Sequence, residues 1–436
     1  MGRRIFRLDA DHVFAAALVA VVCWQTAPLV SDAVASILPG TTPSVGAPVE
    51  PAAPEVASEA PVPGSDGDDD APLTPAGLTP LVVDPAAPTP PVAGADECRT
   101  ELTSDALDAQ LRTGAGMVSG GDYPHAYPLA DGRIVWLFQD VFVGSRESLD
   151  PARFAHNGGF VQDGLCTSPL PGATPGRSWI GGDREDTMMH WFWPLDGAVG
   201  ADGQLFVFVA EMYNLNGTGA AEGALPVATW LAVFDGATLE LRSFTEAPDS
   251  STHLFGYSIA NDERYSYLYG NCYRQFAPAD AGVSLGMDRC SASTVVARVP
   301  RGEFAATPEY FTMQGWSSDG SSPIAVMSGG ISHATSVRHL GTTWVAVTKQ
   351  DEWFGDHLVV ETADRPEGPW RVTSLVPVES LCATCASYGA LVLPWVDDGD
   401  VVVVLSSNDW TAERASQHPG LYRPFVVRIG SDSATG

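Results

Sequence analysis

The chain has 436 residues, with 53 acidic against 23 basic side chains and a formal net charge of −30 at neutral pH. So acidic a surface repels nucleic acids and anionic lipids, and the few Lys and Arg residues form no basic stripe. The composition therefore excludes a nucleic-acid-binding protein, and a neutral or cationic partner fits the charge better.

The first 35 residues have the pattern of an export segment. Three arginines precede an apolar run from Val13 to Cys23, and Ala33-Val34-Ala35 offers the small residues of a signal-peptidase site. A membrane anchor needs roughly 20 apolar residues, and Gln25 and Asp32 interrupt this run. We expect residues 1–35 to be a signal peptide or a membrane anchor, and the protein to be secreted or displayed at the cell surface.

Residues 36–97 are rich in Pro, Ala, Val, Thr and acidic residues, and they contain no aromatic side chain. Such a segment cannot bury enough apolar surface to offset its chain entropy, so it is predicted to be a disordered linker. Residues 98–436 remain as the folded domain. That length is large for an ordinary domain but normal for a β-propeller.

The stretch from Gly120 to Gly144, GGDYPHAYPLADGRIVWLFQDVFVG, predicts a tight β-hairpin. Asp131-Gly132 is a strong turn signal, and the apolar run 134–138 suits a buried strand. With those two residues as the turn, partners across the hairpin have numbers that sum to about 263. Asp122 is then expected beside Val141, and Asp140 beside Tyr123.

Two acidic residues thus arrive at the same open end of one hairpin. Paired carboxylates on one rim are what acid/base hydrolysis of a sugar linkage needs. The alternative is that Asp122 and Asp140 are both solvated loop acids.

Four further hairpins follow at long intervals, and no convincing amphipathic helix stands out. Their segments are 196–213, turning at Asp202-Gly203; 257–271, turning at 261–264; 333–349, turning near Gly341; and 388–408, turning at 397–400. Repeated β units with a period above 40 residues indicate a propeller or an array. We predict an all-β fold, a five-bladed β-propeller of four-stranded blades.

In such a fold the first strand of each blade lines the central channel. This arrangement places Asp122, Asp140, Glu211 and His333 around one opening, where a ligand pocket is expected. Asp122 and Asp140 are the predicted catalytic pair, and Glu211 is the leading substitute for either. Glu211 has the alternative role of a buried structural acid.

The opening motif resembles that of the family catalogued as domain of unknown function 4185, whose members commonly read GGD, a strand, DGR and WLFGDTF. Further similar pieces follow in order: HNGGFVQDG from His156, WFWPLDGAV from Trp191, YLYG from Tyr267 and EGPW from Glu367. Part of that family is classed as glycoside hydrolase family 183, endo-D-arabinanases that cut mycobacterial arabinogalactan and lipoarabinomannan. It also resembles the five-bladed arabinanases and xylosidases of glycoside hydrolase family 43. Gln139 and Val141 depart from the family pattern, which puts the substrate in question more than the carboxylates.

Several residues near the predicted rim are candidates for binding a sugar. His190, Trp191 and Trp193 could form a stacking wall, or they could be core residues between blades. Asn157 could bind a hydroxyl group or form a turn, and His333 could project into the channel or be structural.

No metal or cofactor is expected. The acidic loop at Asp183, Glu185 and Asp186 could bind a structural calcium ion, but it lacks the EF-hand spacing, so a solvated loop is favoured. The six cysteines of residues 98–436 suggest disulfides in an exported chain, with Cys98 joined to Cys166 and Cys272 to Cys290 as candidate pairs. The motif Cys382-x-x-Cys385 stands alone, so a disulfide or free thiols are favoured over zinc.

The sequence thus predicts an exported, monomeric glycoside hydrolase that cleaves internal linkages of an arabinofuranosyl polysaccharide. The competing hypothesis is a non-catalytic glycan-binding propeller on a Pro-rich stalk, because binding alone does not require the acid pair.

Overall fold

The structure is a computed structural model, and the residues that it describes lie in the predicted folded domain. They are residues 98, 102–144, 148–186, 189–214, 224–249, 253–271, 294–327, 336–350, 355–378, 380–409, 415 and 417–430. The predicted export segment and linker, His333, and the cysteine pair 272 and 290 lie outside them. None of the helices described is both long and apolar enough to cross a membrane.

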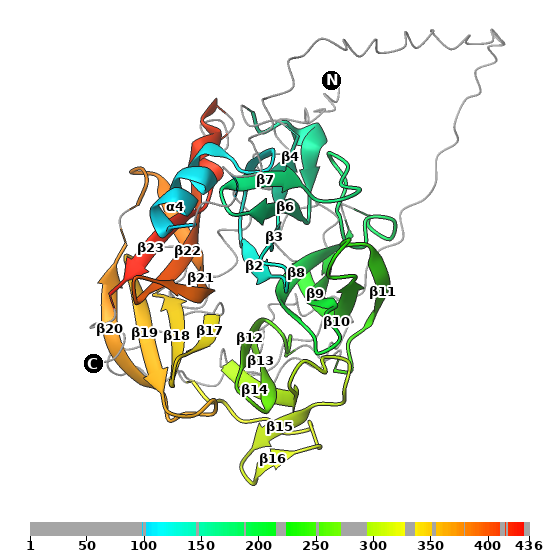
Figure 1. Ribbon diagram of the computed structural model, residues 1–436, viewed down its shortest axis with the longest axis vertical. Helices are drawn as coiled ribbons and strands as arrows, with labels where there is room; N and C mark the ends of the chain where they lie inside the picture. Colours follow the sequence, from blue (N-terminus) through cyan, green and yellow to red (C-terminus); the bar gives the residue numbers. More distant parts are fainter. Residues whose placement is uncertain are drawn as a thin grey trace, which may run out of the picture. The chain divides into compact units, whose positions relative to one another are not determined.

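Five antiparallel sheets follow one another along the described chain as blades (Figure 1). Blade 1 contains β2 (His125–Pro128), β3 (Ile134–Phe138), β6 (Gly158–Asp163) and β7 (Cys166–Pro169). Blade 2 contains β8 (His190–Val199), β9 (Leu205–Asn214), β10 (Ala224–Phe234) and β11 (Leu241–Glu246). Blade 3 contains β12 (Ser258–Asn261), β13 (Tyr265–Asn271), β14 (Thr294–Pro300), β15 (Glu309–Thr312) and β16 (Gly315–Ser317). Blade 4 contains β17 (Ser336–Leu340), β18 (Thr343–Lys349), β19 (His357–Ala363) and β20 (Arg371–Pro377). Blade 5 contains β21 (Cys385–Asp397), β22 (Asp400–Asp409) and β23 (Phe425–Ile429).

The first strands of the blades form a closed ring. Strand β2 contacts β8, β8 contacts β12, β12 contacts β17, β17 contacts β21, and β21 returns to β2. The all-β, five-bladed propeller is therefore confirmed in its architecture. Four strands per blade holds for blades 1, 2 and 4, whereas blade 3 has five strands and the described part of blade 5 has three.

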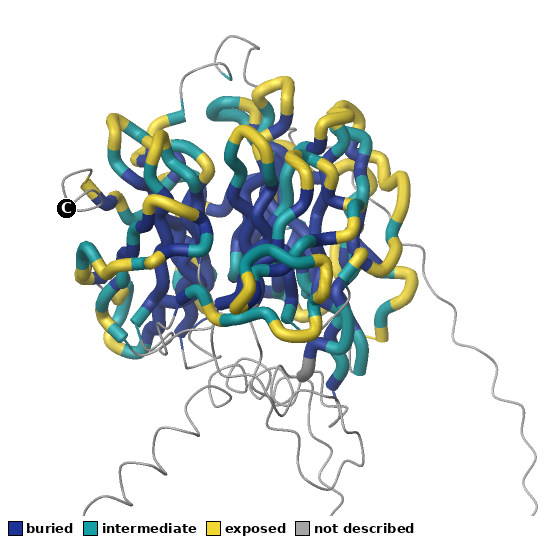
Figure 2. Tube along the Cα trace, turned by 90° about the horizontal axis from the view of Figure 1, so that it is seen from below, coloured by how far each residue is buried: buried dark blue, intermediate teal, exposed yellow. Residues whose placement is uncertain are grey.

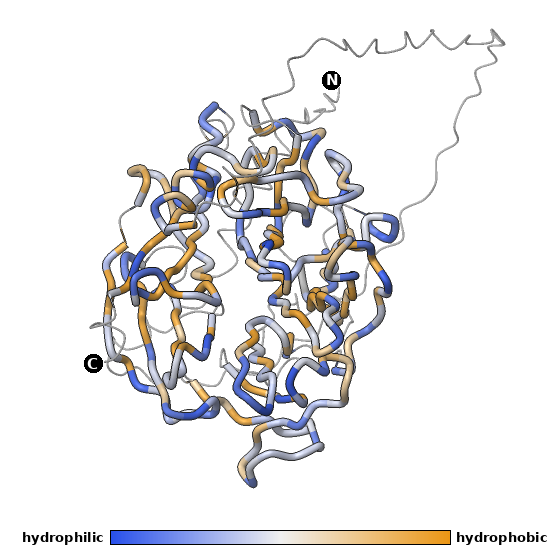
Figure 3. The backbone as a smooth tube through the Cα atoms, viewed as in Figure 1, coloured by the Kyte–Doolittle hydropathy of each residue, from blue (hydrophilic) through white to orange (hydrophobic). Residues whose placement is uncertain are grey.

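Apolar side chains fill the spaces between neighbouring blades. One cluster joins Leu137 of blade 1 to Phe192 and Val207 of blade 2, and all three side chains are almost fully buried. Buried residues follow the strands, and exposed residues lie mainly on the connecting loops (Figure 2). The hydropathy along the trace has the same distribution, with apolar segments in the strands (Figure 3).

Position within a blade explains the strand sequences. The middle strand β22 contains four consecutive valines and is buried on both faces, because Val402 and Val404 pack with blade 1 and Val401 and Val403 pack with blade 4. The outermost strand β20 is mostly exposed or half-buried. The tendency toward continuous apolar runs is therefore strongest in the strands that other blades cover.

A helix that the sequence analysis missed closes the ring. Helix α4 (Ser104–Thr113) begins at the N-cap Thr103, whose hydroxyl accepts a hydrogen bond from the Ala106 N–H. The buried Leu107 and Leu111 pack in one cluster with side chains of blades 1 and 5. The expectation of no amphipathic helix is wrong because a ten-residue helix with two buried leucines gives only a weak periodic signal.

Polar contacts fix this N-terminal segment to both blades. The Val426 N–H of β23 donates to the Asp108 carboxylate of α4 at 2.7 Å. On the other side, Cys98 forms a disulfide with Cys166 of β7, as predicted. Cys98 and helix α4 therefore contact the first blade and the last.

The opening hairpin forms as expected, but its register differs by one residue. The Leu129 N–H donates to the Arg133 carbonyl at 2.7 Å, so three residues form the turn instead of two. Partners across the hairpin sum to 262, as in Gly121 with Val141 and His125 with Leu137. A two-residue Asp-Gly turn was therefore the wrong prediction.

The other four predicted hairpins are confirmed at their turns. The residue pairs that close them are Val199 with Leu205, Asn261 with Ser266, Leu340 with Thr343, and Asp397 with Asp400.

Shortening a buried side chain of α4 should destabilise the whole ring. Leu107→Ala is expected to lower the free energy of unfolding by about 2–5 kcal/mol, because it leaves a cavity between the first and last blades. Urea unfolding followed by Trp fluorescence measures the change. The exposed Ala109 provides the matched control, since Ala109→Ser should cost less than about 1 kcal/mol. Equal losses in the two variants would contradict the role of α4 in closing the ring.

Candidate functional site

Three strands of blade 1 are interrupted at the same level. Beyond the interruption the chain continues as a small separate sheet of β1 (Val118–Gly121), β4 (Val141–Val143) and β5 (Phe154–Ala155). The intervening residues are 122–124, 139–140 and 156–157, and we call them the blade 1 break. The residues of the break lie outside the regular strands, and four of their side chains can titrate: Asp122, Tyr123, Asp140 and His156.

The corrected register brings the backbones of Asp122 and Asp140 together, and their carboxyl groups interact electrostatically. The Asp122 N–H donates to the Asp140 carbonyl at 3.1 Å, and the Asp122 carbonyl accepts from the Gln139 N–H at 3.0 Å. Tyr123, the next residue, has a φ of +42°, which turns the chain back into β2. The predicted convergence of Asp122 and Asp140 is therefore closer than the two-residue turn implied.

Asp122 is a buried carboxyl group, 5% exposed. The Tyr388 hydroxyl of blade 5 donates to its Oδ2 at 2.8 Å, and the Tyr422 hydroxyl also bonds to it. Burial raises the pKa of Asp122 well above its ordinary value, and the neighbouring Asp140 raises it further. The two tyrosine hydrogen bonds act in the opposite direction without overcoming that rise. The protonated form of Asp122 is thus favoured.

Asp140 lies closer to solvent, with 15% of its side chain exposed. Its Oδ1 is 2.9 Å from the His156 Nδ1 and accepts a hydrogen bond of 2.9 Å from the Trp193 indole N–H. His156 is itself buried and stacks on the Trp191 ring, with centroids 4.5 Å apart. The orientation of the Asp140 carboxyl group is therefore fixed from both blade 1 and blade 2.

Glu211 forms a second acidic centre, on β9 of blade 2. Its Oε1 lies 2.6 Å from the His190 Nε2, and its Oε2 accepts from the Trp230 indole at 2.6 Å. The carboxyl group is 19% exposed and His190 is 24% exposed. Among the described residues the hydrogen-bond partners of Glu211 are therefore His190 and Trp230, and neither aspartate is one of them.

Glu185 lies between these two centres. Its Oε1 accepts from the Phe192 N–H at 3.3 Å, and both His156 and His190 interact with it electrostatically. Burial raises the pKa of Glu185, and its hydrogen bond from Ser178 partly offsets this rise. Of the predicted solvated loop, Asp183 and Asp186 are exposed, whereas Glu185 is half-buried.

The candidate sugar-binding residues have different surroundings. Trp193 and His190 are half-buried beside Asp140 and Glu211. Trp191 is fully buried, so neither face of its ring is open to a ligand in this structure. Asn157 is also fully buried, and its amide bonds to the backbone of Ile180 and Phe192.

Gln139, one of the departures from the family pattern, points toward blade 2. It is 7% exposed, and its amide donates to the Pro194 carbonyl at 3.2 Å. Its side chain thus joins two blades beside Asp140.

A small cavity of about 20 Å³ lies between the inner strands and is lined by residues that include His125, Tyr257 and Ser336. His125 is 5% exposed, and neither ring nitrogen has a hydrogen-bond partner among the described residues. Burial lowers the pKa of His125 to about 4, so its ring is neutral near pH 7.

Sequence reasoning missed the closest partners of the acid pair. His156 follows Asp140 by 16 residues and was visible only as the first letter of HNGGFVQDG. Tyr388 lies 266 residues from Asp122, and no local pattern predicts their contact.

Comparison with known proteins gives one family and a group of similar folds. A family profile described as "Domain of unknown function (DUF5005)" matches residues 107–431. This family is not the one that the opening motif resembles. No curated protein matches the sequence significantly.

The similar structures have low sequence identity. A protein of Bacteroides ovatus ATCC 8483, provisionally described as a hydrolase, is 19% identical, with a TM-score of 0.58 over 79% of this chain and 97% of its own. The GH43_1 enzyme of Xanthomonas citri, complexed with xylotriose, is 15% identical, with a TM-score of 0.42 over 74% and 93%. CoXyl43, a GH43 β-xylosidase/α-arabinofuranosidase from a compost microbial metagenome, is 14% identical, with a TM-score of 0.41 over 73% and 93%. At this identity the Bacteroides match shows a shared fold.

The raised pKa of Asp122 predicts how stability depends on pH. Above pH ~3.9 the unfolded chain loses the proton that the folded protein retains, so wild type loses about 1.4 kcal/mol per pH unit until the folded pKa is reached. Asp122→Asn removes this loss. The variant should therefore gain stability relative to wild type between pH 4 and pH 7, as measured by urea unfolding.

Asp131 provides the control, because the Arg133 hydrogen bond lowers its pKa and the side chain is 48% exposed. Its contribution to stability is present above pH ~3.9 and lost below it, so Asp131→Asn should lose stability slightly or stay unchanged over the same interval. The same pH trend in both variants would contradict a buried, protonated Asp122.

Proposed function

The chain belongs to the family described as domain of unknown function DUF5005, and for this member we propose glycoside hydrolysis at the Asp122–Asp140 pair. One observation carries the proposal: within the blade 1 break, Asp122 and Asp140 are joined by a backbone hydrogen bond and their carboxyl groups interact electrostatically. Glycosidases of most families use two carboxyl groups, one to donate a proton and one to attack the sugar or activate water.

The separation expected for such a pair is compatible with this chemistry. The electrostatic interaction between Asp122 and Asp140 places the two carboxyl groups near each other, and carboxyl groups about 5 Å apart suit a nucleophile and an acid. Because Asp122 is buried and interacts electrostatically with Asp140, the state in which both groups are charged is unfavourable. A pair that holds one proton is the starting state that acid-assisted cleavage requires.

The environments support a different role for each member. Asp122, whose pKa is raised, is the proposed proton donor. Asp140, which has more contact with solvent, is the proposed nucleophile or general base. His156 and Trp193 hold Asp140 in place and are positioning residues in this scheme.

The proposed substrate is an arabinofuranosyl polysaccharide, cut at internal linkages. The resemblance of the opening motif to endo-D-arabinanases supports this class, and a neutral glycan suits a chain with a net charge of −30. Half-buried Trp193 and His190 lie beside the acidic centres and could contact the sugar. Export, which the first 35 residues suggest, would bring the protein to such a polymer.

A second candidate function is glycan binding without catalysis. The low exposure of Asp122 favours it, because a proton donor must reach the glycosidic oxygen. The two candidates make different predictions for the same experiment.

We expect the full-length protein to release oligosaccharides from mycobacterial arabinogalactan. Asp122→Asn and Asp140→Asn should each lower the rate by a factor of about 10²–10⁴, the usual loss when an acid or base catalyst is removed. Chromatography of the products measures the rate, and Asp131→Asn, in the same hairpin, should retain wild-type activity. Binding of the polysaccharide with no release at any pH from 4 to 8 would favour the non-catalytic candidate.

Glu211→Gln distinguishes the alternative pair. If Asp122 and Asp140 act together, this variant should keep its turnover number within about tenfold of wild type and change KM more. A loss as large as that of Asp140→Asn, with Asp122→Asn near normal, would assign the acid to Glu211 instead.

A further inference from the structure

Cys382 and Cys385 form a disulfide at the entrance to β21, with only two residues between them. Cys382 is half-buried and Cys385 is 8% exposed, so the first sulfur is the more accessible one. The Cys385 N–H donates to the Cys382 carbonyl at 3.1 Å, which closes a tight turn around the bond.

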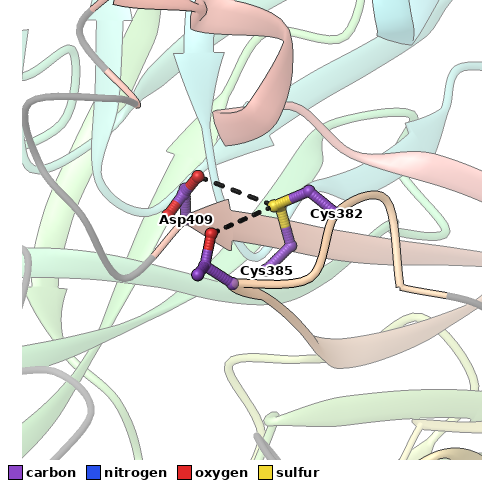
Figure 4. The surroundings of a disulfide bond; sticks show 4 residues. Cys382, Cys385 and Asp409 are labelled. Carbon is purple, nitrogen blue, oxygen red and sulfur yellow. Dashed lines mark hydrogen bonds between the residues drawn. A yellow bond between two sulfur atoms is a disulfide. The ribbon is translucent and has the colours of Figure 1, made fainter.

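A buried carboxyl group lies against this disulfide. Asp409 ends β22, pairs with Cys385 across the sheet and is fully buried. Its Oδ2 is 3.6 Å from the Cys382 Sγ, and the Thr384 hydroxyl is 3.5 Å from the same sulfur (Figure 4). A disulfide sulfur has no hydrogen to donate, whereas a Cys382 thiol at this position can donate to Asp409. Reduction would therefore allow a hydrogen bond from Cys382 to Asp409.

The other described disulfide lacks these features. Cys98 and Cys166 are separated by 68 residues, and their bond links two distant segments. A disulfide that closes a long loop restricts the unfolded chain much more than a disulfide that closes a three-residue loop. Folding therefore stabilises the Cys98–Cys166 bond against reduction more than the Cys382–Cys385 bond. The two disulfides should consequently differ in their resistance to reduction.

We propose that Cys382 and Cys385 are a thiol–disulfide exchange site that takes a dithiol reductant. A thiolate of the reductant attacks the Cys382 Sγ, which breaks the protein disulfide, forms a mixed disulfide and releases the Cys385 thiolate. The second thiolate of the reductant then attacks its own sulfur in the mixed disulfide and releases Cys382. Two protons move from the reductant thiols to the cysteines, which leaves a protein dithiol and an oxidised reductant. Exchange with a small disulfide reverses these steps.

The exchange site is connected to the acid pair by a short piece of sheet. Three residues after Cys385, Tyr388 donates its hydroxyl to Asp122, and its strand partner Ser406 accepts from the Tyr123 N–H at 2.8 Å. Opening the disulfide frees the first residues of β21 from the covalent turn. This consequence rests on the proposed function, whereas the exchange itself does not.

The experiment measures the two disulfides in one molecule. Full-length protein is equilibrated with graded dithiothreitol, trapped with a maleimide and mapped by peptide mass spectrometry. We expect labelling of Cys382 and Cys385 at a dithiothreitol concentration at least about tenfold lower than labelling of Cys98 and Cys166. Opening of both disulfides at one concentration would overturn the proposal.

A second measurement separates exchange from metal binding. The three residues Cys382, Cys385 and Asp409 have ligand atoms within 4.8 Å of one another, so a reduced pair could instead hold a cation. Purified protein is tested for zinc and labelled with and without a chelator. Labelling that is independent of the chelator supports exchange, and zinc that blocks labelling until it is chelated overturns it.

The role of Asp409 is tested at the thiol. A carboxylate disfavours a neighbouring thiolate, so Asp409→Asn should speed maleimide labelling of reduced Cys382 several-fold at pH 7. If the variant does not fold, the pH profile of labelling in wild type replaces it. A Cys382 profile displaced to higher pH than that of Cys98 is expected, and coincident profiles would contradict a role for Asp409.

Hydrolysis reports on the connection to Asp122. Dithiothreitol should change the rate of hydrolysis by the wild-type protein and should not change the rate of hydrolysis by the double variant Cys382→Ser/Cys385→Ser. An equal response of both proteins, with exchange demonstrated by labelling, would reject the connection. Absence of hydrolysis in every protein would reject the proposed function and leave the labelling result standing.

Discussion

The candidate site depends on the closure of the propeller ring between its first and last blades. Asp122 belongs to blade 1, but the hydroxyl groups that bond to it come from Tyr388 in blade 5 and from Tyr422, which precedes β23. Helix α4 holds these blades together with its two buried leucines and its contact to β23. Without closure, Asp122 would face water and its pKa would return toward the ordinary value. Closing the ring is thus also what creates the electrostatics of the acid pair.

The blade 1 break explains why two carboxyl groups tolerate such proximity. In a continuous ladder, opposite acidic side chains would simply repel each other. Here Tyr388 and Tyr422 bond to Asp122, and His156 and Trp193 bond to Asp140, so each carboxyl group has its own partners. The pair remains unfavourable when both members are charged, and one proton relieves it. Such local destabilisation is a common property of functional sites, which keep features that stability alone would remove.

Local signals predicted much of this fold, because each hairpin has its turn residues and apolar strand together in the sequence. The Asp202-Gly203 turn and the turn at Gly341 were found in this way. The register of the first hairpin was predicted wrongly, because a three-residue turn and a two-residue turn share the same Asp-Gly signal. That single residue decides whether Asp122 faces Asp140 or Val141. Prediction from sequence therefore found the acid pair but not its alignment.

Contacts between blades were beyond prediction for a different reason. Tyr388 reaches Asp122 across 266 residues, and Trp193 reaches Asp140 across 53. Neither contact follows from periodicity or spacing, because both depend on how whole sheets are arranged around the ring. For the same reason the aromatic run at Trp191 was ambiguous. Neighbouring residues on a strand point to opposite faces, so Trp191 packs in a cluster with Ile259 of blade 3 while Phe192 packs with blade 1.

Contacts from both neighbouring blades, blade 2 and blade 5, position Asp140 and its surroundings. Gln139 and Trp193 join it to blade 2, while Tyr422 donates to its backbone carbonyl from the side of blade 5. A shift of either neighbouring blade would move one set of these contacts and leave the other in place. Asp122, by contrast, bonds mainly toward blade 5. Changes at the start of β21, such as opening the Cys382–Cys385 disulfide, should therefore affect the proton on Asp122 before they affect the orientation of Asp140.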